Sequence, residues 1–378
     1  MQNSLEKYLS WLTLREIPFL GNALYKKLID QFKSPETVLN ASKGQLGKID
    51  KISSKVIKAI TNHEVFQDKA RKELDLILKK NIKIITLTDN FYPVLLKQIT
   101  DPPPFLTYLG KLNNDSPCIS IIGSRTATSY GLSTSESLSC KLAAKGFQIV
   151  SGLARGIDSM AHIGALKAKG KTIAVLGSGL NKVYPRENKY LFDTIAEKGT
   201  VFSEFRVNAQ PLPSNFPIRN RIIAGLSCGS IVVEAAKRSG SLITARLATE
   251  YNREVFAVPG SIKSKKSAGT HSLLKQGAKL VENEMDIIDE LYHFIHRKKE
   301  KLKTTPLQKQ KSTHYTTCKQ NKCDIIKFIE PYPVHIDVII EKTGMNPSKV
   351  TSQLLDLELE GIIKRHQGNY YSISEEHH

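Results

Sequence analysis

The stretch IVSGLARGIDSMAH, residues 149–162, places a short apolar run directly before a glycine-rich turn and a helical pattern. The glycines allow the chain to turn sharply between a buried strand and a helix. Backbone N–H groups are then exposed at the positive end of the helix dipole, where an anion is stabilised. The stretch therefore predicts a strand, a turn and a helix that bind a phosphate, carried by a small nucleotide, a dinucleotide cofactor or a nucleic-acid strand.

The sequence around this stretch repeats the same strand and helix alternation from residue 118 onward. The strand-like segments are CISIIG, FQIVSG, TIAVLG, TVFSEF, SIVVEA and EVFAVPG. Such alternation predicts an α/β fold, an extended Rossmann-like parallel sheet covered by helices on both faces, over residues 81–292. Open sheets of this kind bind ligands at the carboxyl ends of their strands. We therefore expect the phosphate site to be a single crevice at that edge.

Three further segments surround the predicted core. Residues 1–80 form a helical module that resembles SAM and helix-hairpin-helix domains, in which Ser34 caps a helix and Pro35 takes its first position. Residues 293–322 carry nine Lys and Arg residues against one acidic residue and have little apolar periodicity, which predicts a basic linker. Residues 323–378 follow the order of a winged helix, whose third helix starts at Asn346 and Pro347.

The overall charge favours a polyanionic partner. The chain has 378 residues, 40% hydrophobic content and a formal net charge of +19. An excess of this size attracts nucleic acid first and acidic membranes second. No apolar run approaches the roughly 18 residues that suggest a membrane span, and the N-terminus does not have the pattern of a signal peptide, so we expect a cytoplasmic protein. The five cysteines are odd in number and scattered, and the closest pair, Cys318 and Cys323, predicts ordinary thiols rather than a zinc site.

Small residues and basic residues recur together at the predicted turns. This device gives the candidate phosphate ligands Gly123, Ser124, Arg125, Ser151, Gly152, Arg155, Gly156, Arg219, Asn220, Arg221, Lys237, Arg238 and Ser241. The competing interpretation is that these arginines only cap neighbouring helices. Asp158 is interpreted as a helix cap or as the residue that holds Arg155 in place. Several phosphate-sized sites along one sheet edge exceed what a mononucleotide needs, and they suit an extended nucleic-acid backbone.

The sequence gives little support for a cofactor or for catalysis. No GxGxxG follows the first strand of the core, and no GxxxxGK[ST] motif is present. His162 and His271 have no visible nucleophile partner, so we interpret both as structural. Glu204 and Glu234 end strands, which leaves an acid or base role in the crevice open. We expect no metal, no cofactor and no catalytic residue.

Six motifs in order resemble the DNA-processing protein A family, DprA, also called Smf. They are GSR at 123–125, SGLARGID at 151–158, YPRENKYL at 184–191, FPIRNRIIAGL at 216–226, EAAKRSGSLITARLA at 234–248 and VPGSIKSKKSAGTHSLLKQGA at 258–278. The resemblance implies a non-enzymatic protein that binds and protects single-stranded DNA and loads RecA onto it during natural transformation. It also implies a homodimer.

The resemblance assigns roles to individual positions. The DNA groove is expected to contain Arg125, Arg186, Arg219, Arg221, Lys237, Arg238 and Lys263. Tyr184 and Phe216 are the candidates for base stacking. The dimer surface is expected near Leu273 and Leu274, which in the simplest alternative belong to the core of the monomer.

Two departures from the family pattern qualify these expectations. Pro213 stands where relatives often have a basic residue, so one groove contact is expected either to be missing or to be supplied by Arg206 or Lys263. The presumed recognition helix of the winged helix has one basic residue, Lys349, against three acidic ones. We therefore expect this domain to make protein contacts or to pack on the core rather than to read a DNA duplex.

The main rival is an enzyme with a similar core. LOG-like nucleotide phosphoribohydrolases use a PGGxGT turn and a catalytic glutamate. The matching segment here is PGSIKSKKSAGTH, in which a polar and basic insertion separates PG from GT and no glutamate follows in the next helical turn. This departure disfavours the enzyme, and a LOG-like nucleotide phosphoribohydrolase or another nucleotide-binding Rossmann enzyme is kept as the alternative function.

Overall fold

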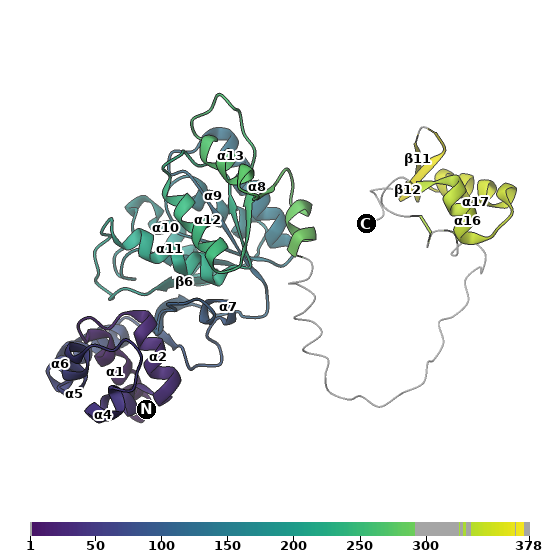
Figure 1. The fold of residues 1–378 in the computed structure, drawn as a ribbon. Helices are drawn as coiled ribbons and strands as arrows, with labels where there is room; N and C mark the ends of the chain where they lie inside the picture. The colour runs from purple at the N-terminus through teal and green to yellow at the C-terminus, as the bar shows by residue number, and fades with distance from the viewer. Residues whose placement is uncertain (1, 292–324, 326–327, 330–333, 367, 374–378) are drawn as a thin grey trace, which may run out of the picture. The chain divides into compact units, whose positions relative to one another are not determined.

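The structure, a computed structural model, describes residues 2–291, 325, 328–329, 334–366 and 368–373. The chain divides into two units, residues 1–304 and 305–378, and each is described by itself. In Figure 1 the first unit runs from purple to green and the second is yellow-green to yellow. The predicted linker at 293–322 lies outside the described residues.

The first unit begins with six helices. They are α1 (Gln2–Glu16), α2 (Asn22–Phe32), α3 (Pro35–Leu39), α4 (Lys43–Leu46), α5 (Ser54–Thr61) and α6 (Glu64–Lys79). The Ser34 side chain accepts a hydrogen bond from the Thr37 backbone at the start of α3, so the predicted cap is confirmed. Trp11 and Tyr25 stack at 5.8 Å between ring centroids and fill the interior of this helical module.

A nine-stranded sheet follows, in the order β1-β2-β6-β5-β4-β3-β7-β8-β9. Its strands are β1 (Lys83–Thr86), β2 (Phe105–Gly110), β3 (Cys118–Ile122), β4 (Gln148–Ser151), β5 (Thr172–Leu176), β6 (Thr200–Ser203), β7 (Gly229–Val232), β8 (Glu254–Ala257) and β9 (Lys279–Leu280). All strands from β3 to β9 pair in parallel, whereas β2 is antiparallel to β1 and β6. The six predicted core strands are confirmed. The strand order reverses at β3, which has β4 on one side and β7 on the other, and this is where such sheets bind ligands.

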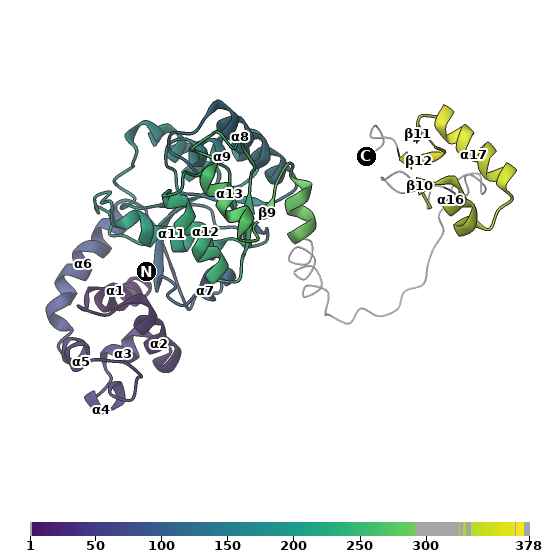
Figure 2. The same ribbon diagram turned by 45° about the horizontal axis from the view of Figure 1, so that its top comes forward.

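Helices cover both faces of the sheet. They are α7 (Val94–Lys97), α8 (Ser129–Ala144), α9 (Ile157–Lys167), the 3-10 helix η1 (Arg186–Asn188), α10 (Lys189–Lys198), α11 (Asn215–Leu226), α12 (Gly240–Glu250) and α13 (Ala268–Lys275). Figure 2 shows α8 close to α9 and α11 close to α12.

The strand sequences explain this two-sided cover. Successive side chains of a strand point to opposite faces. Ile121 packs in the hydrophobic cluster that holds residues of α8 and α9, whereas Ile122 packs in the cluster that holds residues of α11 and α12. Ile231 and Val232 of β7 divide in the same way. The nearly continuous apolar strands are therefore buried on both faces, as the sequence predicts.

The second unit contains the predicted wing. Its elements are β10 (Val334–His335), α16 (Ile336–Thr343), α17 (Pro347–Leu359), β11 (Ile363–His366) and β12 (Tyr370–Ile373), with the strand order β10-β12-β11. Gly344 ends α16 with a positive φ of 60°. The Asn346 side chain caps α17, so the predicted start of this helix is confirmed. The first predicted helix of this domain lies almost wholly outside the described residues. None of the helices that the structure describes is long and apolar enough to cross a membrane.

Candidate nucleic-acid interface

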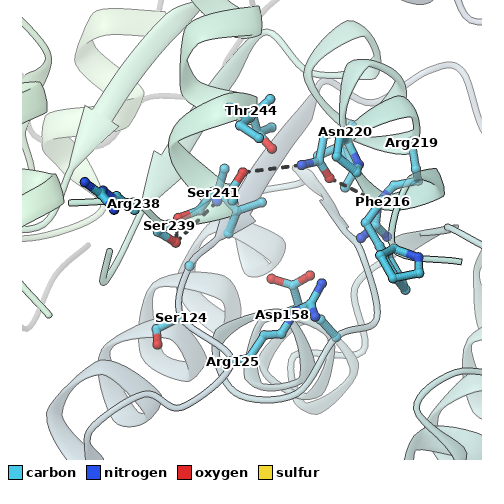
Figure 3. Close-up of a pocket in the computed structure, with 18 of the residues that line it drawn as sticks. Ser124, Arg125, Asp158, Phe216, Arg219, Asn220, Arg238, Ser239, Ser241 and Thr244 are labelled. Atoms are coloured by element: carbon cyan, nitrogen blue, oxygen red, sulfur yellow. Dashed lines mark hydrogen bonds between the residues drawn. The ribbon is translucent and has the colours of Figure 1, made fainter. Parts of the chain in front are cut away.

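A pocket of about 650 Å³ opens at the carboxyl ends of β3, β4 and β7, where the strand order reverses. Its labelled side chains come from the turns after these strands, from the start of α9 and from the first two turns of α11 and α12 (Figure 3). The lining residues that carry polar groups or rings include Ser124, Arg125, Asp158, Tyr184, Phe216, Arg219, Asn220, Arg238, Ser239, Ser241 and Thr244. The predicted single crevice is therefore present at the expected edge.

The two glycine turns of this edge lie directly against each other. The Ile157 N–H donates to the Ser124 carbonyl oxygen at 3.2 Å. Gly156 has a φ of +73°, and a Cβ atom there would lie 2.3 Å from the same oxygen. A side chain at this position would therefore clash with the first turn and strain the backbone. Glycine at 156 fixes the distance between the turns that follow β3 and β4.

Arg219 is buried in the floor of the pocket and is 3% exposed. Its Nη1 donates to the backbone carbonyls of Gly152, at 2.7 Å, and of Val175. A Cβ atom on Gly152 would lie 2.3 Å from this nitrogen, so the glycine provides the space for the guanidinium. Burial lowers the pKa of Arg219 to about 10, opposed by Asp158, and the side chain is still protonated at pH 7. Arg219 therefore fastens α11 to the ends of β4 and β5 and adds a positive charge below the pocket.

Asp158 is the carboxylate that faces this arginine. Its Oδ2 accepts the Gly152 N–H at 3.1 Å, and burial raises the pKa of the carboxyl, while Arg219 and Arg125 lower it. It stabilises the turn after β4, but it does not hold Arg155 as the sequence interpretation proposed. The Nη2 of Arg155 instead donates to Glu187 at 2.7 Å.

Arg125 lies exposed at the rim of the pocket. Its guanidinium carbon is 5.0 Å from the centre of the Phe216 ring, and the Phe216 ring is 5.8 Å from that of Tyr184. Stacking on the ring orients the planar guanidinium and leaves its N–H edge available for a phosphate. Among the described residues, none accepts a hydrogen bond from the Arg125 side chain. The two predicted base-stacking residues therefore lie together beside an unpaired arginine.

The first turn of α12 forms the opposite wall. Ser239 is the N-cap, and its hydroxyl accepts the Ser241 N–H at 3.4 Å. The Asn220 amide donates to the Gly240 carbonyl at 3.4 Å and so connects α11 to this turn. Arg238 precedes the helix and is exposed. A helix N-terminus, two hydroxyls and an arginine together favour a phosphate.

Sequence reasoning missed Ser239 and Thr244 in this wall. The capping role of Ser239 follows from its place before Gly240, and Thr244 lies one helical turn after Ser241. Helical spacing from the predicted Gly240 and Ser241 turn was therefore the signal that could have found both residues.

Among the described residues that line the pocket, the charged side chains are mainly positive. Arg125, Arg219 and Arg238 supply three guanidinium groups, and Asp158 supplies one carboxylate. A pocket with this balance stabilises an anion. Phosphate is the group that fits both the charge and the paired N–H donors.

Arg221 was predicted in the groove, and the structure does not bring it there. It is 6% exposed, its Nη1 donates to the Asp101 carbonyl oxygen at 2.6 Å, and its Nη2 pairs with Glu204. Glu204 also accepts the Asn22 amide at 2.6 Å, so the charge cluster connects α11 to the helical module. We therefore assign Arg221 a structural role and omit it from the groove.

Other predicted ligands do not line the pocket. The Ser151 hydroxyl donates to the Ile121 carbonyl at 2.6 Å and is buried in the sheet. Arg186, Lys237 and Lys263 are exposed outside the pocket lining. They are available to a strand that extends beyond it. Arg206, one of the substitutes expected for Pro213, pairs instead with Glu16 of α1.

The candidate acids and bases also lie elsewhere. Glu234 accepts the Thr128 N–H at 2.9 Å below the start of α8, and Glu204 lies in the Arg221 cluster. Neither carboxylate is among the described residues that line the pocket, so the acid or base role that the sequence left open gains no support. His162 is fully buried, its Nδ1 lies 2.7 Å from the Thr172 hydroxyl, and burial followed by Arg219 lowers its pKa to about 3.

The predicted dimer residues lie in α13 and are half-buried. Leu273 packs against the hydrophobic cluster of its own chain, as the simplest alternative proposed. Cys118, Cys140 and Cys228 are reduced thiols, whereas Cys318 and Cys323 lie outside the described residues. A search of the described residues finds no cluster of three metal-binding side chains.

Comparison with known sequences identifies both units. Residues 83–292 match the sequence family described as DNA recombination-mediator protein A, and residues 321–369 match the DprA winged helix domain. Protein Smf of Synechocystis is 34% identical over 98% of this chain and 99% of its own length. DNA processing protein DprA of Streptococcus pneumoniae is 43% identical over 62% of this chain and 84% of its own length.

Two solved structures of DNA processing protein A are similar to this chain. DNA processing protein A from Streptococcus pneumoniae superposes with a TM-score of 0.64 at 37% identity and covers 74% of this chain and 95% of its own. A structure of DNA processing protein A from Helicobacter pylori, described by its single-stranded DNA binding mode, gives 0.51 at 32% identity over 56% of this chain and 96% of its own. The sequence matches and the superposed folds thus agree, and the chain belongs to the DNA recombination-mediator protein A family, DprA/Smf.

Proposed function

We propose that this protein binds single-stranded DNA by its phosphates, in the pocket at the carboxyl ends of β3, β4 and β7. The observation that carries the proposal is Arg125, an exposed arginine stacked on Phe216 at the rim of a pocket that has two further guanidinium groups. Such a site has little base specificity, because its hydrogen-bond donors are arginines and backbone amides that contact phosphates. Tyr184 and Phe216 add stacking that tolerates any base.

The spread of the site favours a strand over a mononucleotide. In Figure 3, Arg238 and Phe216 lie at opposite ends of the labelled residues. Arg186, Lys237 and Lys263 are exposed beyond the lining and supply further charge. The relative from Helicobacter pylori is described as binding single-stranded DNA, which supports the same ligand here.

Family membership supports the finer parts of the proposal. In the cytoplasm, the protein protects incoming single-stranded DNA during natural transformation, loads RecA onto it and acts as a homodimer. It does so by binding and without catalysis; in keeping with this role, the Asp158 carboxylate in the pocket lining accepts the Gly152 N–H and stabilises the turn after β4.

The test is fluorescence anisotropy of labelled single-stranded and duplex oligonucleotides over a salt series. We expect the wild type to prefer single strands and the variant Arg125→Ala with Arg238→Ala to bind about 100-fold more weakly, because two charged hydrogen-bond donors are removed. The slope of log affinity against log salt falls by about 0.7 for each phosphate that the variant no longer neutralises. Arg246→Ala is the matched control, since this exposed arginine of α12 pairs with Glu250 and does not line the pocket.

Equal binding by the wild type and the double variant would refute the pocket as the DNA site. Tight binding of a nucleoside monophosphate with no binding of oligonucleotides would restore a nucleotide-binding Rossmann enzyme. RecA loading is tested by the DNA-dependent ATP hydrolysis of RecA, which the wild type stimulates and the double variant does not. Sedimentation of Leu274→Arg tests the dimer, and we expect monomers.

A further inference from the structure

We propose that Tyr190 is a base-stacking platform that extends the DNA track beyond the pocket, along η1 and the first turn of α10. The inference rests on the proposed function and adds a stacking site that the pocket lining does not contain. Tyr190 is 84% exposed, which is an unusual position for a large aromatic side chain. Exposure of this kind marks a binding surface only when its surroundings point to a ligand.

The segment that carries Tyr190 is fastened to the wall of the pocket. Asn188 is the last residue of η1, and its amide donates to the Leu153 carbonyl at 2.8 Å and to the Ser159 hydroxyl at 2.9 Å. The turn between these two partners contributes Ala154 and Asp158 to the pocket lining. Tyr190 follows two residues later, so these hydrogen bonds of Asn188 hold the start of α10 beside this turn.

Tyr190 is also connected to the pocket by the chain itself. Tyr184 lines the pocket and is 45% exposed, and η1 starts two residues after it. From Arg186 to Tyr190 the helical path rises about 6–8 Å. Tyr184, Arg186 and Tyr190 thus place a ring, a cation and a ring in order along residues 184–190, beginning at a residue that lines the pocket.

The charges along this series favour a phosphate backbone. Glu187 is paired with Arg155, and Asp193 of α10 is paired with Lys189, so both acids are neutralised. Within the described residues, no partner is recorded for the side chain of Arg186. Single-stranded DNA is bound by aromatic side chains interleaved with cations of this kind. A partner protein would be favoured by an apolar patch, whereas Tyr190 is surrounded by charged residues of its own helix.

Because Tyr190 packs on little, its removal does not disturb the fold. We expect Tyr190→Ala to keep the stability of the wild type and to weaken binding of a long oligothymidylate about 5- to 100-fold, the range typical for removal of one stacked base. Tyr190→Phe keeps the ring and binds like the wild type. A short oligothymidylate of about four nucleotides, a length near the smallest site sizes, fills the pocket alone and is insensitive to Tyr190→Ala.

A spectroscopic readout tests the stacking directly. The chain has one tryptophan, Trp11, which is 1% exposed and stacked on Tyr25. The full-length variant Tyr190→Trp adds a second, exposed indole, whose fluorescence is quenched when a base stacks on it. We expect a long oligothymidylate to quench this signal and to leave the wild-type signal unchanged.

Phe91→Ala serves as the control for loss of an exposed ring, since Phe91 is 69% exposed and does not line the pocket. Long-oligonucleotide affinity that is the same for Tyr190→Ala and the wild type, together with an unquenched Tyr190→Trp, would overturn the inference while the proposed function stands. If the wild type binds no single-stranded DNA, both the proposed function and the inference fail. The affinity of the wild type therefore distinguishes failure of the proposed function from failure of the inference alone.

Discussion

Arg219 and Arg221 leave the same helix two residues apart, both are almost fully buried, and they serve two different regions. Arg219 binds backbone carbonyls below the pocket, whereas Arg221 binds Glu204 and Asp101 next to the helical module. A step of two residues turns about 200° around a helix, so the two side chains point to opposite sides. The comparison teaches that a pair of arginines close in sequence is not a pair in space.

The two regions also differ in what their charges do. At the contact with the helical module, Arg221 and Arg206 each have a carboxylate partner. At the pocket, no described residue pairs with Arg125 or Arg238. Charges that are already paired stabilise the fold, and charges that are left in water at a rim are available to a ligand. Stability and binding should therefore respond to different arginines.

The largest expected effect is on stability and comes from Arg221→Ala. Removal of one partner leaves Glu204 charged in a largely buried site, which costs about 3–5 kcal/mol. We expect the free energy of unfolding, measured by urea titration, to fall by that amount. Protein that remains folded should bind single-stranded DNA with wild-type affinity, because Arg221 does not line the pocket.

The variant Arg221→Met with Glu204→Leu is the control for this effect. It removes both charges and replaces them with apolar groups of similar size, so it should be more stable than Arg221→Ala. If the double replacement is less stable than the single one, the pair is not the source of the loss.

Arg219→Ala should lower both the stability of the fold and the affinity for single-stranded DNA. The carbonyls of Gly152 and Val175 lose their donor and Asp158 loses its opposing charge, which costs about 2–4 kcal/mol of stability. The turn after β4 is no longer held, so we also expect about tenfold weaker binding of single-stranded DNA. Anisotropy and urea titration on the same preparation measure the two losses. Unchanged affinity in the folded variant would contradict the placement of the pocket above Arg219.

His162 tests whether the region below the pocket tolerates a second positive charge. Burial and Arg219 lower its pKa from 6.5 to about 3. The contribution of neutral His162 to the free energy of unfolding is therefore fully present above pH 6.5. It is lost as the pH falls, because His162 of the unfolded chain becomes protonated at a higher pH than His162 of the folded protein. One proton costs about 1.4 kcal/mol per pH unit, so about 2–3 kcal/mol is lost between pH 6.5 and 4.5.

The measurement is the slope of unfolding free energy against pH in the wild type and in His162→Asn. The asparagine does not titrate, and its slope should be flatter over this window by nearly one proton. Thr172 offers its hydroxyl to either side chain, since its own hydrogen is donated to the Ile149 carbonyl. Parallel slopes would show that His162 is already protonated in the folded protein or is not buried.

Much of the fold follows from the sequence because it depends on patterns with a fixed period. Several of the apolar strand segments end in glycine, and Ser34 and Asn346 cap helices, so the six core strands and both helix starts were predictable. The glycines also indicate where turns pack closely, since a Cβ atom at Gly152 or Gly156 would overlap neighbouring atoms. These signals act over a few residues and need no knowledge of the tertiary structure.

The site was predictable only in part because burial and partner choice depend on distant segments. Nothing near Arg221 in the sequence shows that it pairs with Glu204, 17 residues away. Nor does it show that Glu204 also accepts a hydrogen bond from Asn22, which is 182 residues from Glu204. Glu234 likewise ends a strand at the right edge but turns toward Thr128. The sequence therefore predicts which residue lies at a strand end, whereas the direction of its side chain is set by packing.

The smallest expected effect concerns the exposed pair at the far side of the pocket. Arg155 and Glu187 are both more than half exposed, so Arg155→Ala should leave the free energy of unfolding nearly unchanged. It should still weaken binding of single-stranded DNA by about twofold to fivefold, because Glu187 is left as an unpaired negative charge close to the strand. Arg155→Ala with Glu187→Ala restores the wild-type net charge and should recover most of that affinity, measured by anisotropy at low salt. Recovery would show that Arg155 acts by neutralising its partner, as Arg221 does in the interior. An affinity that stays low in the double variant would instead make Arg155 a direct phosphate ligand and place it with Arg125.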